Sequence, residues 1–341
     1  MEATIREEAM RSSINRWRGK SAKLSGRTSF VKILLSILLL TKLFGGHDIL
    51  ARSIARDLAQ PVIVDDFVTL DRLRVHYIES GTGRTVVMIH GNAGSVEDFE
   101  FGALDTLSGA YRVLAIDRPG HGKSDRPNGS ASVEFQAELL HRSLSKLGVT
   151  QPVLVGHSWG ASLALAYSLK YPGEVSGMVL LAPAAYPDES DNGLLGALAR
   201  TPLLGDLSLI LGRTLMGHHI LRAGLVRAFY PQPVLNNYTK LADSLWLGRK
   251  QVKAYLEDEA SLNESLREMS KRYSGINIPV VIVTGDKDKI VSPDRNARAL
   301  NEVIPNSRLI EIKDMGHEIP QTHPESIAAA LKLIAQTRFI K

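Results

Sequence analysis

A serine between two glycines is the strongest chemical signal in this sequence. In the stretch GHSWG, residues 156–160, Ser158 stands between Gly156 and Gly160, which fits the pattern G-x-S-x-G. An apolar run precedes it and a segment with helical spacing follows, so the serine lies at a predicted strand-to-helix turn. Such a turn exposes the hydroxyl as a nucleophile, and side chains two residues to either side would collide there. The alternative interpretation is a purely structural turn.

A nucleophilic serine needs a base, and the base needs an acid that orients it. After Ser158 the chain offers Asp286 and Asp288, at the end of an apolar run, and His317 in the stretch EIKDMGHEIP. Both stretches end predicted parallel strands, and open α/β sheets bind ligands at the carboxyl ends of their strands. The chain order Ser, Asp, His is the one expected when a G-x-S-x-G turn supplies the nucleophile. The helix after the serine would also let the Trp159 amide stabilise a developing oxyanion.

Short apolar runs that alternate with helical segments are the elements that must position these side chains. Helical spacing predicts helices over 132–148, 159–172 and 292–305. Strands are predicted at 67–71, 73–80, 85–90, 112–117, 152–158, 177–184, 279–286 and 307–312. Continuous apolar strands alternating with helices indicate an α/β fold with a mostly parallel, doubly wound sheet covered on both faces.

Residues 186–275 interrupt this alternation. They contain no predicted strand and read as several helices, notably over 195–217 and 249–273. A structureless connection of this length is improbable, so a helical lid is expected. Its leucine-rich part indicates a hydrophobic acyl or ring-bearing substrate, or else a core for the lid itself. His218 and His219 lie in this segment and are expected to be solvated or packed.

The net positive charge of the protein lies in its first 32 residues. The net charge is +5, and the first 32 residues contain eight Lys/Arg and only three Glu, so the rest of the chain is neutral. A basic folded face for nucleic acid is therefore not expected. The chain has no cysteine, which excludes disulfides, cysteine nucleophiles and thiolate metal sites. No oligomeric state is indicated.

A basic N-terminal arm, residues 1–29, leads into an apolar segment at residues 30–44, FVKILLSILLLTKLF. As a helix this segment would span roughly 22 Å, short of the ~30 Å hydrocarbon layer, although lysines near its ends can snorkel. The expectation is an uncleaved signal anchor, with the catalytic domain on the non-cytoplasmic side. A cleaved signal of a secreted or periplasmic protein, or an interfacial helix on the cytoplasmic face, remains open. Residues 45–65 form a connecting arm.

Five stretches together resemble the α/β-hydrolase superfamily, over a region that runs from about Leu70 to the end. They are HGNAGS (90–95), DRPGHGKS (117–124), GHSWGA (156–161), GDKDKIV (285–291) and MGHE (315–318). The resemblance implies a core of residues 66–185 and 276–341 with the lid inserted at 186–275. It implies that Asp288, fourth in a G-x-x-D pattern, is the acid and His317 the general base. It further implies that the backbone amide of Asn92 is the second oxyanion donor.

The implied activity is that of a serine hydrolase acting on a hydrophobic or lipid-like carboxylic ester, without cofactor or metal. Dehalogenases and epoxide hydrolases of this superfamily carry aspartate at the turn, so Ser158 argues against both. A C–C bond hydrolase or a perhydrolase is the near alternative, and a non-catalytic ligand-binding relative is a second. GHGKS is not a phosphate loop, because Asp117 stands where that motif requires glycine.

Overall fold

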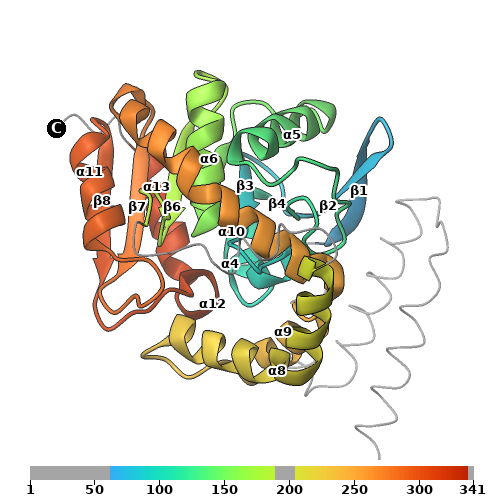
Figure 1. Ribbon diagram of the computed structural model, residues 1–341. Coiled ribbons are helices and arrows are strands. Elements are labelled where there is room, and N and C mark those ends of the chain that lie inside the picture. The colour runs from blue at the N-terminus through green and yellow to red at the C-terminus, as the bar shows by residue number, and fades with distance from the viewer. Residues whose placement is uncertain (1–61, 189–203, 337–341) are drawn as a thin grey trace, which may run out of the picture. The chain divides into compact units, whose positions relative to one another are not determined.

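The computed structural model describes residues 62–188 and 204–336, and within them one eight-stranded sheet (Figure 1). The strand order is β1-β2-β4-β3-β5-β6-β7-β8; β2 is antiparallel to both of its neighbours, and β3 to β8 are parallel. The strands are β1 (Val64–Leu70), β2 (Leu73–Ser80), β3 (Thr85–Ile89), β4 (Arg112–Ile116), β5 (Val153–His157), β6 (Gly177–Leu181), β7 (Val280–Gly285) and β8 (Ser307–Ile312). The predicted mostly parallel sheet is confirmed.

Helices cover both faces of this sheet, which is why its central strands, such as β5, β6 and β7, are buried along their whole length. Alternate residues of a strand point to opposite faces. Thus Leu154 of β5 packs with α5 (Val133–Lys146) and α6 (Trp159–Lys170), whereas Val153 and Val155 pack with α4 (Ala103–Ser108) and α13 (Glu325–Gln336). The sheet is therefore the middle layer of an α/β/α sandwich, with a hydrophobic core on each side.

Two of the predicted helices form over nearly their expected ranges, and the third is divided. Helix α5 begins after Ser132, whose side chain caps the Phe135 amide, and α6 begins directly after Ser158. The predicted helix at 292–305 is a π-helical turn, η3 (Asp294–Arg298), followed by α11 (Ala299–Val303). Helix α13 was not predicted, although its sequence ESIAAALKLIAQ has apolar residues at helical spacing. The short η1 (Val96–Phe99) and α12 (Ile319–Thr322) complete the core.

The described part of the segment between β6 and β7, from residue 204 to residue 275, is mainly helical, as predicted. Its described helices are α8 (Leu204–Phe229), α9 (Asn236–Leu245), α10 (Arg249–Met269) and η2 (Ser270–Gly275), and we call these four the helical insertion. Helix α10 packs on α5, α6 and α8, so it joins the insertion to one face of the sandwich (Figure 1). The side chains of the leucine-rich stretch at 204–216 lie outside the described part of the structure.

The N-terminal predictions lie almost entirely outside the described residues. This holds for the basic arm at 1–29, the apolar segment at 30–44 and most of the connecting arm at 45–65. β1 already begins at Val64, two residues before the predicted start of the core. No helix in residues 62–188 or 204–336 combines the length and the hydropathy that a membrane crossing requires.

Candidate active site

Ser158 occupies a sharp turn between β5 and α6. Its backbone has φ 54° and ψ −117°, a region that L-residues rarely enter and that costs on the order of 1–3 kcal/mol. The two flanking glycines allow the turn to close. A Cβ on Gly156 would collide with the carbonyl of Gly160, and a Cβ on Gly160 would collide with the carbonyls of Ile89 and His90. The G-x-S-x-G pattern is thus required here by close backbone packing.

We expect Gly160→Ala to destabilise the fold by about 3 kcal/mol or more, because the backbone of β3 leaves no room for a methyl group. Urea unfolding followed by circular dichroism measures the effect. Gly109→Ala is the matched control: Gly109 has a helical φ of −71°, and a Cβ there would meet no atom within 4 Å. Equal stabilities of the two variants would contradict the assigned role of Gly160.

The structure brings Asp288 and His317 together across the ends of two neighbouring strands. Asp288 follows β7, His317 follows β8, and His317 Nδ1 lies 2.7 Å from Asp288 Oδ2. The other oxygen of Asp288 accepts hydrogen bonds from the amides of Ile290 and Val291, at 2.7 and 2.9 Å. Both side chains are almost completely buried. The carboxylate therefore fixes the orientation of the ring and leaves Nε2 as the nitrogen available for proton transfer.

Burial and charge oppose each other in this pair. Burial is the largest influence on the Asp288 pKa and raises it, but the charge and hydrogen bond of His317 and the two amides together hold the pKa below its ordinary value. Burial likewise acts to lower the His317 pKa, but the negative charge and hydrogen bond of Asp288, helped by Glu318, raise it above 6.5. The pair is thus arranged to stabilise a histidine cation.

Asp286, the alternative acid, has a different environment. Its Oδ1 lies 3.4 Å from the Met315 amide, and its other oxygen lies 3.6 Å from the ammonium of Lys287. The observed contacts therefore couple Asp288, and not Asp286, to His317.

Ser158 and His317 both line one cavity of about 320 Å³. Among the described residues no hydrogen bond joins the Ser158 hydroxyl to His317, and such contacts often tighten only when substrate is bound. Residues of the helical insertion form part of the cavity wall, and the lining is mixed. Its apolar side chains include Leu225, Ala228, Trp246, Leu262, Leu266, Ile290 and Val291, and its polar ones include Asp98, Asp188, Glu259, Asn263, Arg295 and Glu318. Within residues 62–188 and 204–336, no His, Asp and Glu cluster suits a metal ion.

Asn92 and Trp159, whose amides are the two predicted oxyanion donors, both line this cavity. Trp159 is the first residue of α6, so its amide has no acceptor one turn earlier in the helix. Asn92 lies in the loop after β3, also on the cavity. Its side chain is held from two sides: Nδ2 donates to Glu259 Oε2 at 2.8 Å and to the Tyr255 carbonyl at 3.1 Å, and Oδ1 accepts from Arg118 at 3.3 Å. The sequence analysis assigns only the backbone amide of Asn92, and the structure shows that its side chain also connects this loop to α10.

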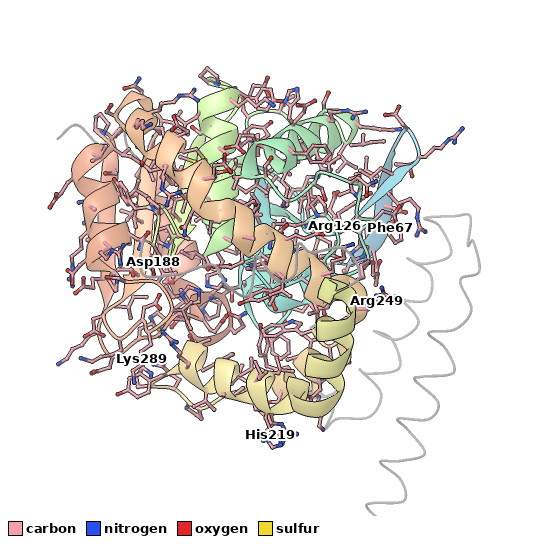
Figure 2. The ribbon with its side chains drawn as sticks, viewed as in Figure 1. Phe67, Arg126, Asp188, His219, Arg249 and Lys289 are labelled. Atoms are coloured by element: carbon pink, nitrogen blue, oxygen red, sulfur yellow. The ribbon has the colours of Figure 1, made fainter. Side chains whose placement is uncertain are left out.

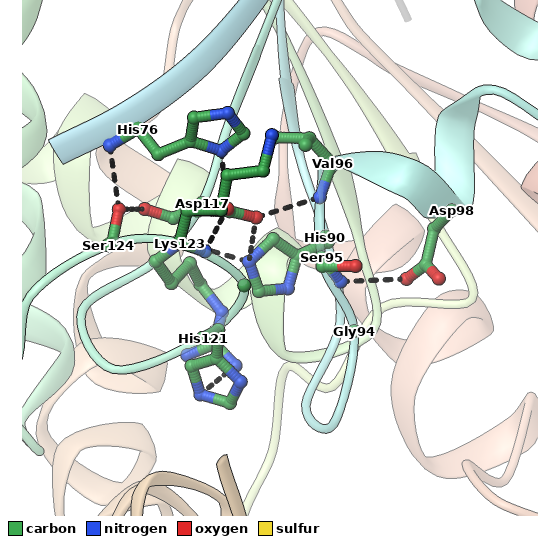
Figure 3. A network of polar contacts seen from close by, with 12 residues as sticks. His76, His90, Gly94, Ser95, Val96, Asp98, Asp117, His121, Lys123 and Ser124 are labelled. Carbon is green, nitrogen blue, oxygen red and sulfur yellow. Dashed lines mark hydrogen bonds and ion pairs between the residues drawn. The ribbon is translucent and has the colours of Figure 1, made fainter. Parts of the chain in front are cut away.

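A buried carboxylate after β4 organises the loop that carries Asn92. Figure 3 shows Asp117, which accepts from the Val96 amide and the Lys123 amide, both at 2.8 Å, and lies 2.6 Å from His76 Nδ1. It therefore ties the loop at 90–96 to the loop at 118–124. His90 Nε2 accepts from the Arg118 amide at 2.9 Å and strengthens the same link.

Four other histidines of the described residues are not part of the His317–Asp288 pair. His157 Nε2 lies 3.0 Å from the His317 carbonyl, and burial, followed by the nearby charge of His317, lowers the His157 pKa to about 3. His218 pairs with Asp243 at the surface, and Figure 2 shows His219 projecting outward from α8. Neither of these two lines the cavity. His121 contacts Asp258 of α10 at 3.1 Å.

Residues 84–324 match the family model described as the alpha/beta hydrolase fold. The chain belongs to the α/β-hydrolase family. A 2-hydroxy-6-oxononadienedioate/2-hydroxy-6-oxononatrienedioate hydrolase of Burkholderia vietnamiensis is 30% identical over 271 residues, which cover 74% of this chain and 88% of that protein. Lipase 3 of a Moraxella species is 28% identical, covering 69% of this chain and 72% of that protein. The predicted family is therefore confirmed, and these relatives are themselves named as hydrolases.

Solved structures agree on the fold. An α/β-hydrolase named as the epoxide hydrolase CorEH superposes with a TM-score of 0.69, at 21% identity, over 80% of this chain and 99% of that one. An esterase from Exiguobacterium antarcticum gives a TM-score of 0.63 at 21% identity, over 80% of this chain and all of the other. Proteins named for different reactions thus share this fold, and the side chains of the site must distinguish between reactions.

Proposed function

We propose that the protein is a serine hydrolase that cleaves a carboxylic ester through an acyl-enzyme. The observation that carries the proposal is the His317–Asp288 pair on the same cavity as the strained Ser158 turn. An epoxide hydrolase or dehalogenase reaction is disfavoured because serine, and not aspartate, occupies the turn. The mixed lining suits a substrate with an apolar body and few polar groups.

In the proposed reaction, His317 Nε2 takes the Ser158 proton while Oγ forms a bond to the acyl carbon. The carbonyl electron pair moves to oxygen, and the amides of Asn92 and Trp159 bind that oxyanion. Asp288 stabilises the imidazolium, which then donates its proton to the leaving alkoxide as the C–O bond breaks. Water repeats the sequence, so the acid is released and the Ser158 hydroxyl is restored.

A fluorophosphonate probe tests the proposal directly, because it modifies only an activated serine. We expect the probe to label the native protein, with peptide mass spectrometry assigning the adduct to Ser158. Prior heat denaturation provides the control for nonspecific labelling. A native protein that hydrolyses no p-nitrophenyl ester and takes up no probe would refute the proposal.

The Burkholderia relative is named as a hydrolase of an unsaturated keto diacid, and this favours a second candidate function for the present chain, cleavage of a C–C bond in such a substrate. Arg295 on the cavity wall would suit a carboxylate of such a substrate, although it already contacts Asp188 at 3.1 Å. Comparing kcat/KM for a panel of esters of increasing acyl length with that for a 2-hydroxy-6-oxodienoate decides between the two. Perhydrolysis is tested in the same panel by adding acetate and hydrogen peroxide.

We also propose that the helical insertion acts as a lid and that residues 30–44 anchor the protein in a membrane. The first proposal is supported by the position of α8, α9 and α10 on the cavity, and the second by the basic arm before the apolar segment. The anchor would leave the catalytic domain on the non-cytoplasmic side. Cell fractionation and protease access from the outside measure both the anchoring and the orientation.

The His317 pKa predicts how activity depends on pH. A protonated ring cannot act as a base, so kcat/KM is expected to rise with pH through an inflection above 6.5. Asp288, Glu318 and His157 are the titratable groups that lie closest to the ring. A pH–rate profile with a p-nitrophenyl ester measures the inflection, and a value below 6 would contradict the predicted direction.

A further inference from the structure

Arg118 is a charged side chain with almost no access to solvent. It follows β4 in the DRPGHG loop, and its side chain is only 1% exposed. Burying a guanidinium is costly unless it is paired and hydrogen-bonded, so its partners indicate why it is there. It is not one of the residues that line the cavity, and the proposed reaction does not use it.

The partners of Arg118 include both segments that carry the proposed oxyanion donors. Its Nη2 donates to the carbonyl of Gly91 at 3.1 Å and to Asn92 Oδ1 at 3.3 Å. Its guanidinium carbon lies 3.9 Å from the centre of the Trp159 ring, so the cation stacks on the aromatic face. One planar group therefore contacts the peptide group that contains the Asn92 amide, through its Gly91 carbonyl, and also the residue whose amide begins α6.

The counter-ion of Arg118 comes from the helical insertion. Asp258 of α10 lies 2.7 Å from Arg118 Nη1, is fully buried, and also contacts Arg126 at 2.9 Å. Gln136 of α5 accepts a further bond from Arg118 at 3.2 Å. Burial lowers the Arg118 pKa to about 10, opposed by the charge of Asp258, so the group stays charged at neutral pH.

We infer that Arg118, neutralised by Asp258, is a positioning residue that sets the distance between the Asn92 and Trp159 amides of the oxyanion hole. The inference rests on the proposed serine hydrolase function. Arg118 does not touch the reacting atoms; it acts through the loop at 90–95 and the first turn of α6. By pairing with Asp258 it also makes α10 a part of the catalytic framework. A lysine would keep the charge but not the plane or the fork of donors.

The test is Arg118→Lys, which retains a cation for Asp258. We expect kcat for a p-nitrophenyl ester to fall by about 10–100-fold, because a shift of about 1 Å in a donor is enough for such a loss. KM should change by less than about threefold, since the hole binds the transition state in preference to the substrate. The rate of phosphonylation by a fluorophosphonate should fall in parallel, and circular dichroism with thermal unfolding reports whether the variant is folded.

Arg126→Gln is the matched control. Arg126 contacts the same Asp258, together with Glu257, but neither Asn92 nor Trp159 (Figure 2 locates Arg126 beside α10). Its kcat should remain within about twofold of the native value, because Asp258 keeps Arg118 and His121 as partners when Arg126 is replaced. A native kcat in Arg118→Lys, or an equal loss of kcat in both variants, would overturn the inference. The proposed function would still stand in that case if the native protein is labelled at Ser158. A native protein without labelling would overturn both.

If Arg118→Lys does not fold, Asn92→Ala provides the same test from the other side. It keeps the backbone amide but removes the whole amide side chain at a half-buried position: Oδ1, which accepts from Arg118, and Nδ2, which donates to Glu259 and to the Tyr255 carbonyl of α10. A loss of kcat of about tenfold with an unchanged KM supports the inference. An unchanged kcat overturns it.

Discussion

Replacing Ser158 by alanine is expected to lower kcat for an activated ester by about 10⁵–10⁶-fold, because the acyl-enzyme can no longer form. The oxyanion donors and the cavity remain, so KM should change little and a small residual rate over uncatalysed hydrolysis should persist. Loss of the hydroxyl leaves the backbone turn in place, and the melting temperature should therefore stay close to the native one.

The matched control is Ser168→Ala, which lies on α6 about 2.8 helical turns after Ser158. Ser168 is buried but does not line the cavity. Native kcat in Ser168→Ala and the loss in Ser158→Ala would together assign the reaction to one hydroxyl. Turnover by Ser158→Ala above about 1% of the native rate would contradict the proposed acyl-enzyme mechanism.

Asp288→Asn is expected to lower kcat by about 10⁴-fold, because an amide in place of the carboxylate neither holds the required tautomer of His317 nor stabilises its cation. The rising limb of the pH profile should move to lower pH, since the charge of Asp288 is what raises the His317 pKa against the effect of burial. The measurement is the pH dependence of kcat/KM for both proteins.

Asp286→Asn separates this role from a general effect of the loop. Asp286 lies two residues before Asp288. An asparagine at position 286 can still accept a hydrogen bond from the Met315 amide through its Oδ1. Its kcat and pH profile should stay close to native. A larger loss in Asp286→Asn than in Asp288→Asn would transfer the acid role to the other carboxylate.

Much of the fold was predictable because its signals are local. Apolar runs such as TVVMIH give strands buried on both faces, and the glycines around Ser158 mark a turn that only small residues permit. The positions of Asp288 and His317 follow from a rule of topology: the loops after neighbouring parallel strands meet at one edge. The chain order and the motifs were therefore sufficient to bring the acid and the base together.

The supports of the site were not predictable, because they depend on contacts between distant segments. Asp258 lies in α10, 140 residues from its partner Arg118, and nothing in RKQVKAYLEDEASLNESLREMSKRY distinguishes it from the solvated acids around it. The stack of Arg118 on Trp159 is equally invisible in sequence. The spacing of apolar residues along the chain predicts helices and strands, whereas the pairing of buried charges can be recognised only in the folded protein.

The buried bond between Arg118 and Asp258 has a consequence for exchanging parts between relatives. Insertions of this kind are attractive modules for grafting, since they form much of the wall around the substrate. Here a graft that replaced α10 without an acid at the position of Asp258 would leave the buried Arg118, stacked on Trp159, without its counter-ion. We expect such a chimaera to lose turnover together with its old selectivity. New specificities are better sought by varying α8 and α9 while α10 is left as it is.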